Sequence, residues 1–119
     1  MSNANMTHSD GAIQDEVIVE LKEILAEEFP LLITTYLQDA NDRLFKLQSA
    51  IDTSDAPCIK AEAHSLKGSS INLGAVELAE LLSKMETCGS TATLAEVPAL
   101  LTAVQSEFSR AEHCLRSYL

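Results

Sequence analysis

Apolar side chains recur along the chain every three or four residues, the spacing that places them on one face of an α-helix. A first stripe comprises Ile13, Val17, Leu21 and Ile24. Pro30 follows, and it suits the first turn of a new helix because its missing N–H has no partner there. A second stripe then comprises Ile33, Leu37, Ala40, Leu44, Leu47 and Ile51. The pattern predicts a short helix from about residue 13 and a long helix from Pro30 to about Ile51.

A third helix is predicted after the polar residues 53–55. Ser54 or Asp55 can cap its first turn, which holds Pro57. The helix extends to about Asn72, and Gly74 is suited to the left-handed conformation that often ends a helix. The pattern continues into a fourth helix with Leu78, Leu82 and Met85 facing inward and Gly89 at its end.

The last predicted helix has the most regular pattern. Thr93 and Glu96 resemble a capping box, but Pro98 then falls beyond the first turn, so the helix start is a residue or two later or irregular. Its apolar seam comprises Leu94, Val97, Leu101, Val104, Phe108, Ala111, Leu115 and Tyr118. A seam with alternating spacings of three and four is typical of a helix in a bundle. We therefore predict an all-α fold. Residues 13–119 form an antiparallel four-helix bundle with an additional short N-terminal helix, and residues 1–12, which include His8, form a flexible tail.

Composition narrows the possible functions. The 119 residues suffice for one domain, 46% are hydrophobic and only 4% aromatic, and the net charge is −10. This acidity argues against nucleic-acid binding, because phosphates would be repelled. Neither a membrane-spanning run nor a signal peptide is visible, and the three cysteines read as free, buried or half-buried thiols. We expect a cytoplasmic protein.

The charge is unevenly distributed. Residues 13–55 carry ten acidic and three basic side chains, whereas residues 56–90 carry four acidic and three basic ones. The three bases of this nearly neutral segment are Lys60, Lys67 and Lys84. It is therefore where we look for a functional site.

His64 stands out in this segment. A helical projection places Ile59, Ala63, Leu66, Ser70 and Leu73 along one line, which must face the core. His64 lies about 140° from that line and points outward, with Lys60, Ala61, Lys67 and Gly68 around it. An imidazole is a good nucleophile near pH 7, and neighbouring ammonium groups attract phosphate oxygens. The arrangement suits a covalent phosphoryl acceptor, although spacing alone also fits an ordinary surface histidine.

Gly68 is unusual because glycine inside a helix costs about 1 kcal/mol relative to alanine. Two explanations are open. Gly68 leaves room for another surface to approach His64, or it relieves packing against a neighbouring helix.

The segment around His64 resembles the signature of histidine-containing phosphotransfer (HPt) domains. The resemblance rests on Ala63-His64-Ser65-Leu66-Lys67-Gly68-Ser69-Ser70, then Asn72-Leu73-Gly74-Ala75, Leu78-Ala79 and Met85-Glu86. It implies a phosphorelay intermediate in which His64 accepts a phosphoryl group from a receiver-domain aspartate and passes it to another receiver. The expected partners are receiver domains of a hybrid histidine kinase and of response regulators, and the expected divalent ion (Mg) sits on the receiver, with no cofactor on this chain.

The same resemblance assigns roles to individual residues. Lys67 matches the lysine that helps to neutralise the phosphohistidine, and Gly68 matches the small residue that lets a receiver dock. Glu86 falls where relatives carry a polar residue, Gln in some of them, near the histidine. A glutamate there could orient the imidazole, but its charge would repel phosphate, and an ordinary surface acid fits the position equally well. The docking face is expected to include Lys60, Ala61, Gly68 and Ile71.

Two rival functions follow from the residues. The first is a helical module that docks on a receiver without transferring phosphate. The second is a carboxylate-type metal bundle, which would need inward Glu-x-x-His motifs; three residues before His64 is Ala61, and three before His113 is Arg110. We expect His113 to be a surface residue. The sequence has no Gly-rich nucleotide loop, so the chain is expected to be a phosphocarrier rather than a kinase. The resemblance further implies a monomer.

Overall fold

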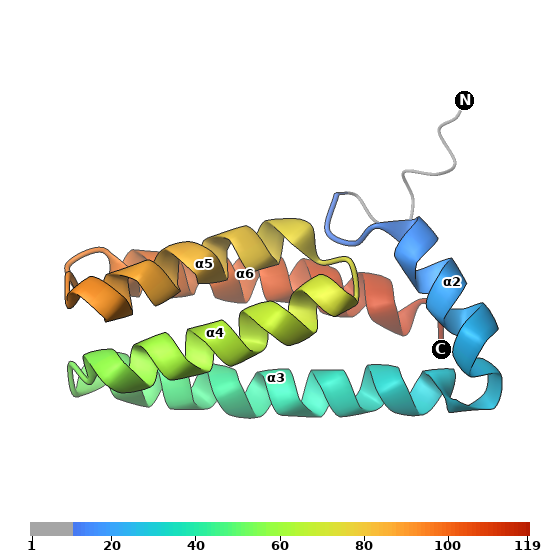
Figure 1. Ribbon diagram of the computed structural model, residues 1–119, viewed down its shortest axis with the longest axis horizontal. Helices are drawn as coiled ribbons and strands as arrows, with labels where there is room; N and C mark the ends of the chain where they lie inside the picture. The colour runs from blue at the N-terminus through green and yellow to red at the C-terminus, as the bar shows by residue number, and fades with distance from the viewer. Residues whose placement is uncertain (1–10) are drawn as a thin grey trace.

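The computed structural model describes residues 11–119, which form helices joined by short links, with no strand among them. The elements are α2 (Asp15–Leu25), the 3-10 turn η2 (Ala26–Glu28), α3 (Phe29–Asp52), α4 (Ala56–Asn72), α5 (Val76–Thr91) and α6 (Val97–Arg116). Helices α3 to α6 run alternately up and down as an antiparallel bundle, and α2 lies across one end (Figure 1). This architecture is the predicted one. Of the predicted tail, residues 1–10 with His8 lie outside the described part, and Ala12 is buried.

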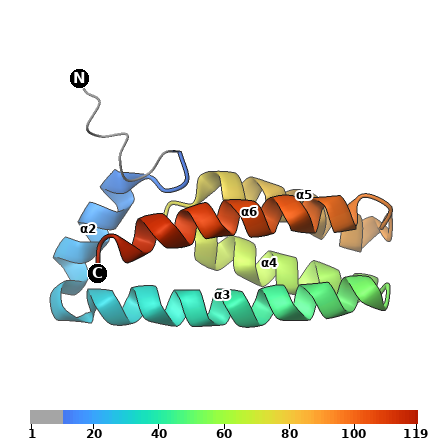
Figure 2. The same cartoon turned by 180° about the vertical axis from the view of Figure 1, so that it is seen from behind.

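The four long helices pack in a closed ring. Helix α3 contacts α4 and α6, and α5 contacts the same two helices from the other side. Figure 2 shows α6 running between α5 and α3 on the face opposite α4. The hydroxyl of Tyr118, just after α6, donates a hydrogen bond to Asp15 at the start of α2. This bond ties the N-terminal helix to the C-terminal end of the bundle.

The predicted apolar stripes form the core. The stripe of α3 and the seam of α6 are buried or half-buried throughout, as predicted. The prediction is wrong for Ile24, which is 70% exposed, while Ile18 is fully buried in its place. Helix α2 begins at Asp15, so Ile13 precedes it and the helical spacing counted from Ile13 does not apply. Cys114 is buried and Cys58 and Cys88 are half-buried, as expected, and none of the described helices combines the length and apolarity needed to cross a bilayer.

The helix ends agree with prediction in some places and not in others. Asp55 caps α4 by accepting a hydrogen bond from the backbone N–H of Cys58 at 3.1 Å, and Gly74 is left-handed at φ 79°. The capping box at Thr93 does not form, because α6 begins at Val97 with Pro98 in its first turn. Its first-turn proline sets this start, since proline needs no N–H partner there.

The prediction that Gly89 ends α5 is wrong, because the helix continues to Thr91 and Ala92 adopts the left-handed conformation instead. Gly89 is buried against α4, where the backbones of the two helices meet. A Cβ atom at Gly89 would lie 2.7 Å from the backbone nitrogen of Lys60 and 3.0 Å from the carbonyl oxygen of Ala56. The glycine therefore permits a close approach of α5 to the helix that carries His64.

We predict opposite effects of the same substitution at two helical glycines. Gly89→Ala forces the α4 and α5 backbones apart and should lower the free energy of unfolding by about 1–3 kcal/mol. Gly68→Ala is the matched control, because a Cβ atom at Gly68 meets nothing within 4 Å. It should raise the free energy of unfolding by about 0.5–1 kcal/mol, since alanine loses less backbone entropy in a helix. Urea denaturation measures both, and equal stabilisation by the two variants would contradict the assigned close approach.

Candidate functional site

His64 lies on the outer face of α4, opposite the residues that fill the core. The predicted core line is confirmed, because each of its members is at most 2% exposed: Ile59, Ala63, Leu66, Ser70 and Leu73. The His64 side chain is 67% exposed. His113, on α6, is also exposed, as predicted. The register of α4 thus presents the imidazole to solvent.

One carboxylate from the neighbouring helix contacts both polar side chains of the site. Glu86 of α5 places Oε2 at 2.9 Å from His64 Nδ1 and Oε1 at 2.8 Å from Lys67 Nζ. The Glu86 side chain is 21% exposed, so it lies between the two helices rather than standing free on the surface. The structure thus brings together the three residues that the sequence singled out from segments far apart in the chain.

The electrostatics of this cluster define the state of the imidazole. The ammonium of Lys67 is the main cause that lowers the pKa of Glu86 below its ordinary value; partial burial opposes it, and the hydrogen bond from His64 adds a further, smaller lowering. Glu86 is therefore an ionised acceptor at neutral pH. A nitrogen 2.9 Å from an ionised carboxylate must carry the ring proton, which assigns the proton to Nδ1. In the neutral ring Nε2 then holds the free lone pair.

One shallow hollow borders His64 and a second borders Lys67, and together they contain the predicted docking residues. A hollow of about 290 Å³ is lined by Pro57, Lys60, Ala61, His64 and Glu86. A second, of about 350 Å³, is lined by Lys67, Gly68, Ile71, Val76, Ala79, Glu80 and Ser83. The sequence analysis did not predict that Val76 and Ala79 of α5 line this hollow. Their spacing of three residues on one helix face was the available signal, but only the packing of α5 on α4 shows that this face adjoins Gly68.

The two explanations for Gly68 can now be distinguished. An added Cβ atom would meet nothing within 4 Å, so the glycine does not relieve packing against a neighbouring helix. Open space instead lies above Gly68, one turn after His64. The structure therefore leaves the first explanation, room for an approaching surface.

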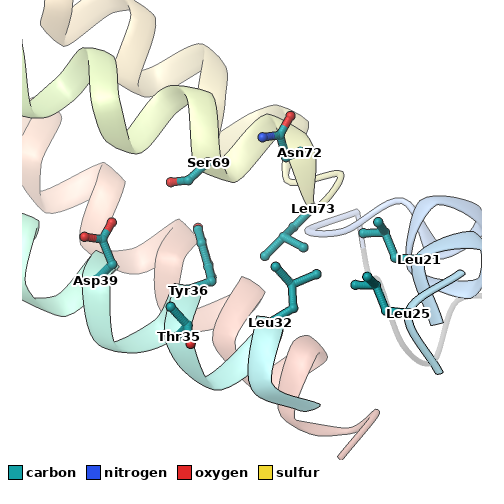
Figure 3. Close-up of a pocket in the computed structure, with 9 residues that line it drawn as sticks. All are labelled: Leu21, Leu25, Leu32, Thr35, Tyr36, Asp39, Ser69, Asn72 and Leu73. Atoms are coloured by element: carbon teal, nitrogen blue, oxygen red, sulfur yellow. The ribbon is translucent and has the colours of Figure 1, made fainter. Parts of the chain in front are cut away.

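A larger groove lies on another side of α4 and is built differently. Figure 3 shows its lining between α2, α3 and α4, with Leu21, Leu25, Leu32 and Leu73 gathered at one end. Its volume is about 600 Å³, and its lining is mainly apolar. The hydroxyl oxygen of Tyr36, which lines the groove, lies 2.7 Å from the hydroxyl oxygen of Ser70. Burial raises the pKa of Tyr36 to about 12. The groove contains no nucleophile comparable to His64, and no group of three or more His, Cys, Asp or Glu within residues 11–119 could hold a metal ion.

Comparison with known proteins relates the chain to one family. The family model described as "Hpt domain" matches residues 31–114. Among solved structures, the chain resembles the histidine-containing phosphotransfer protein B (HptB) of Pseudomonas aeruginosa PAO1, with a TM-score of 0.87 and 32% sequence identity. The match covers 90% of this chain and 93% of that one. No curated protein matches the chain significantly.

The ion pair between Lys67 and Glu86 predicts how the carboxyl titrates. A depressed pKa means that this interaction stabilises the fold above the ordinary pKa of glutamate and is lost as the pH falls through the lowered value. In Lys67→Ala, the pKa of Glu86 should rise toward its ordinary value, because its main cause of depression is gone. Carbon-detected NMR titration of the side-chain carboxyl measures this. An unchanged Glu86 titration in Lys67→Ala would show that the ion pair does not form in solution.

Proposed function

The chain belongs to the family of histidine-containing phosphotransfer domains, and we propose that His64 is its phosphoryl acceptor. The family places it in two-component signalling as a phosphotransfer intermediate. The observation that carries the proposal is the exposed imidazole whose Nδ1 is held by Glu86 while Lys67 lies alongside. Exposure makes the ring accessible to another protein, and the carboxylate leaves Nε2 as the nucleophilic nitrogen.

The proposed reaction needs little machinery from this chain. A receiver domain presents an aspartyl phosphate together with its bound divalent ion. The lone pair of His64 Nε2 attacks the phosphorus, the bond between phosphorus and the aspartate oxygen breaks, and its electron pair returns to the carboxylate. Passing the group onward is the same step in reverse with another receiver. Because such a transfer depends on in-line positioning, a rigid helix is a suitable support for the nucleophile.

The neighbours of His64 have distinct proposed roles. Lys67, with its ammonium next to the ring, helps to neutralise the incoming phosphoryl group. Glu86 orients the ring through Nδ1. Lys60 and Ala61 in one hollow, and Gly68 and Ile71 in the other, contact the receiver. Ile71 supports this assignment, since 48% of this large apolar residue is exposed.

The proposed partners are receiver domains of a hybrid histidine kinase and of response regulators, which the chain meets as a monomer. It acts as a phosphocarrier without kinase activity of its own. Its phosphoryl group is proposed to come from a receiver, because the sequence has no Gly-rich loop with which to bind a nucleotide donor.

Replacing the nucleophile tests the proposal directly. His64→Gln should abolish acid-labile phosphorylation by a phosphorylated receiver without unfolding the protein, since the side chain is exposed. His113→Gln is the matched control, because it removes an exposed histidine from α6 and should leave transfer unchanged. The measurement is transfer of radiolabelled phosphate from the receiver, with circular dichroism to verify folding. Label retained on His64→Gln would refute the assignment, and receiver binding without any label on the wild-type protein would indicate a module that only docks.

The open space above Gly68 gives a test of docking. Gly68→Leu should fold normally but slow transfer from a receiver at least tenfold, because the new side chain occupies the space that the partner needs. Phosphorylation by a small donor such as phosphoramidate should be nearly unchanged, since such a donor does not need the docking face. The two rates are measured on the same preparation. Equal losses with both donors would contradict a docking role and point to damage at His64 itself.

A further inference from the structure

We propose that Glu86 does more than orient His64: its charge keeps the proton on Nδ1 while the ring is phosphorylated, so that the ring remains a good leaving group. Lys67, on the other carboxylate oxygen, compensates the charge that would otherwise repel the phosphoryl group. This inference rests on the proposed function of His64. It assigns a positioning and charge-setting role to a residue that the family resemblance alone leaves undecided.

The geometry uses both oxygens of one carboxylate. Oε2 accepts from His64 Nδ1 at 2.9 Å, and Oε1 contacts Lys67 Nζ at 2.8 Å. The two partners lie three residues apart on α4, so they face Glu86 from adjacent positions of one helix surface. Gly89, three residues after Glu86, lets the backbone of α5 rest on α4 and brings the carboxylate within reach. Glu86 is thus held from both sides by the helix that carries the nucleophile.

The chemistry shows what a negative charge adds at this position. When Nε2 attacks phosphorus, the ring carries a proton on Nδ1 and a phosphoryl group on Nε2, and it becomes cationic. A carboxylate next to Nδ1 stabilises that cation through a charge-assisted hydrogen bond. In the onward step the bond between Nε2 and phosphorus breaks, and its electron pair stays on Nε2. A protonated ring then leaves as neutral imidazole, whereas a deprotonated ring would have to leave as an anion.

The surrounding charges favour this arrangement. In the described chain, Lys60 and Lys67 approach the His64 site from α4, and Glu86 approaches it from α5. Glu80 of α5 lines the adjacent hollow, beside Lys67 rather than at the ring. Repulsion between Glu86 and a phosphoryl group is therefore offset by the ammonium of Lys67, while attraction between Glu86 and the cationic ring acts across a single hydrogen bond. The ion pair between Glu86 and Lys67 thus reduces the repulsion that a glutamate would otherwise exert on a phosphoryl group.

Glutamine separates the two roles of Glu86. In Glu86→Gln the amide oxygen can still accept from Nδ1, so orientation is kept, but the negative charge is gone. If Glu86 only orients the ring, Glu86→Gln should transfer phosphate with the wild-type pH profile. If it also holds the proton by its charge, the phosphorylated ring of the variant should lose its proton at lower pH.

The test compares the pH dependence of transfer from phosphorylated protein to a receiver, between pH 6 and 9. Glu77→Gln is the matched control, since it removes an exposed acid of the same helix that faces Arg110 of α6 and lines neither hollow. We expect wild type and Glu77→Gln to share one profile. The alkaline fall of Glu86→Gln should move down by about one pH unit, the shift expected when one carboxylate charge in hydrogen-bond contact is removed. That shift corresponds to transfer about tenfold slower on the alkaline side. Superimposed profiles, or a loss of equal size at every pH, would overturn the proposal.

A second measurement does not depend on the variant being well folded. In the phosphorylated wild-type protein, nitrogen-15 NMR of the ring should show a proton on Nδ1 at pH 8. A deprotonated Nδ1 under these conditions would also overturn the proposal. Failure of the proposed function has a different signature, because then the wild-type ring would carry no phosphoryl group at all.

Discussion

The close contact of two helix backbones at Gly89 is the constraint on which the site depends. No residue with a Cβ fits there without displacing α4 or α5, because the backbone of Lys60 lies too near. This contact sets how deeply α5 rests on α4. Glu86 precedes it by three residues and lies 2.9 Å from His64 and 2.8 Å from Lys67, two contacts that a wider separation of the helices would lengthen. A residue without a side chain therefore positions the polar groups of the site.

The overall fold could be predicted because the apolar residues whose burial drives folding recur periodically along the sequence. The stripes of α3 and α6 each repeat over many turns, so one irregular position does not obscure the face that is buried. The outward direction of His64 followed from the same periodicity, since it depends only on the angle between His64 and the core line of α4. Ile24 shows the limit of the method, because the short helix α2 offers few turns and its start was placed two residues too early.

Contacts between helices could not be predicted in the same way. The sequence placed Glu86 near the histidine by resemblance, but it could not show that one carboxylate contacts both His64 and Lys67. Gly89 was interpreted as a helix end because glycine has two common uses, ending a helix and allowing close packing, and a single sequence does not distinguish them. Gly68 had two explanations as well, space for a partner or close packing of helices, and the structure excludes close packing because a Cβ atom there would meet nothing within 4 Å.

Because a side chain at position 68 would point into open space, the packing of the core places no demand on the residue found there. Since no atom of the described chain occupies that space, the identity of residue 68 is of little consequence to the core beneath it. On the proposed docking role, a substitution there changes the surface that a partner meets, and it also removes the residue that is least favourable inside a helix after proline. Descendants of this chain could therefore acquire different partners without a loss of stability in the bundle.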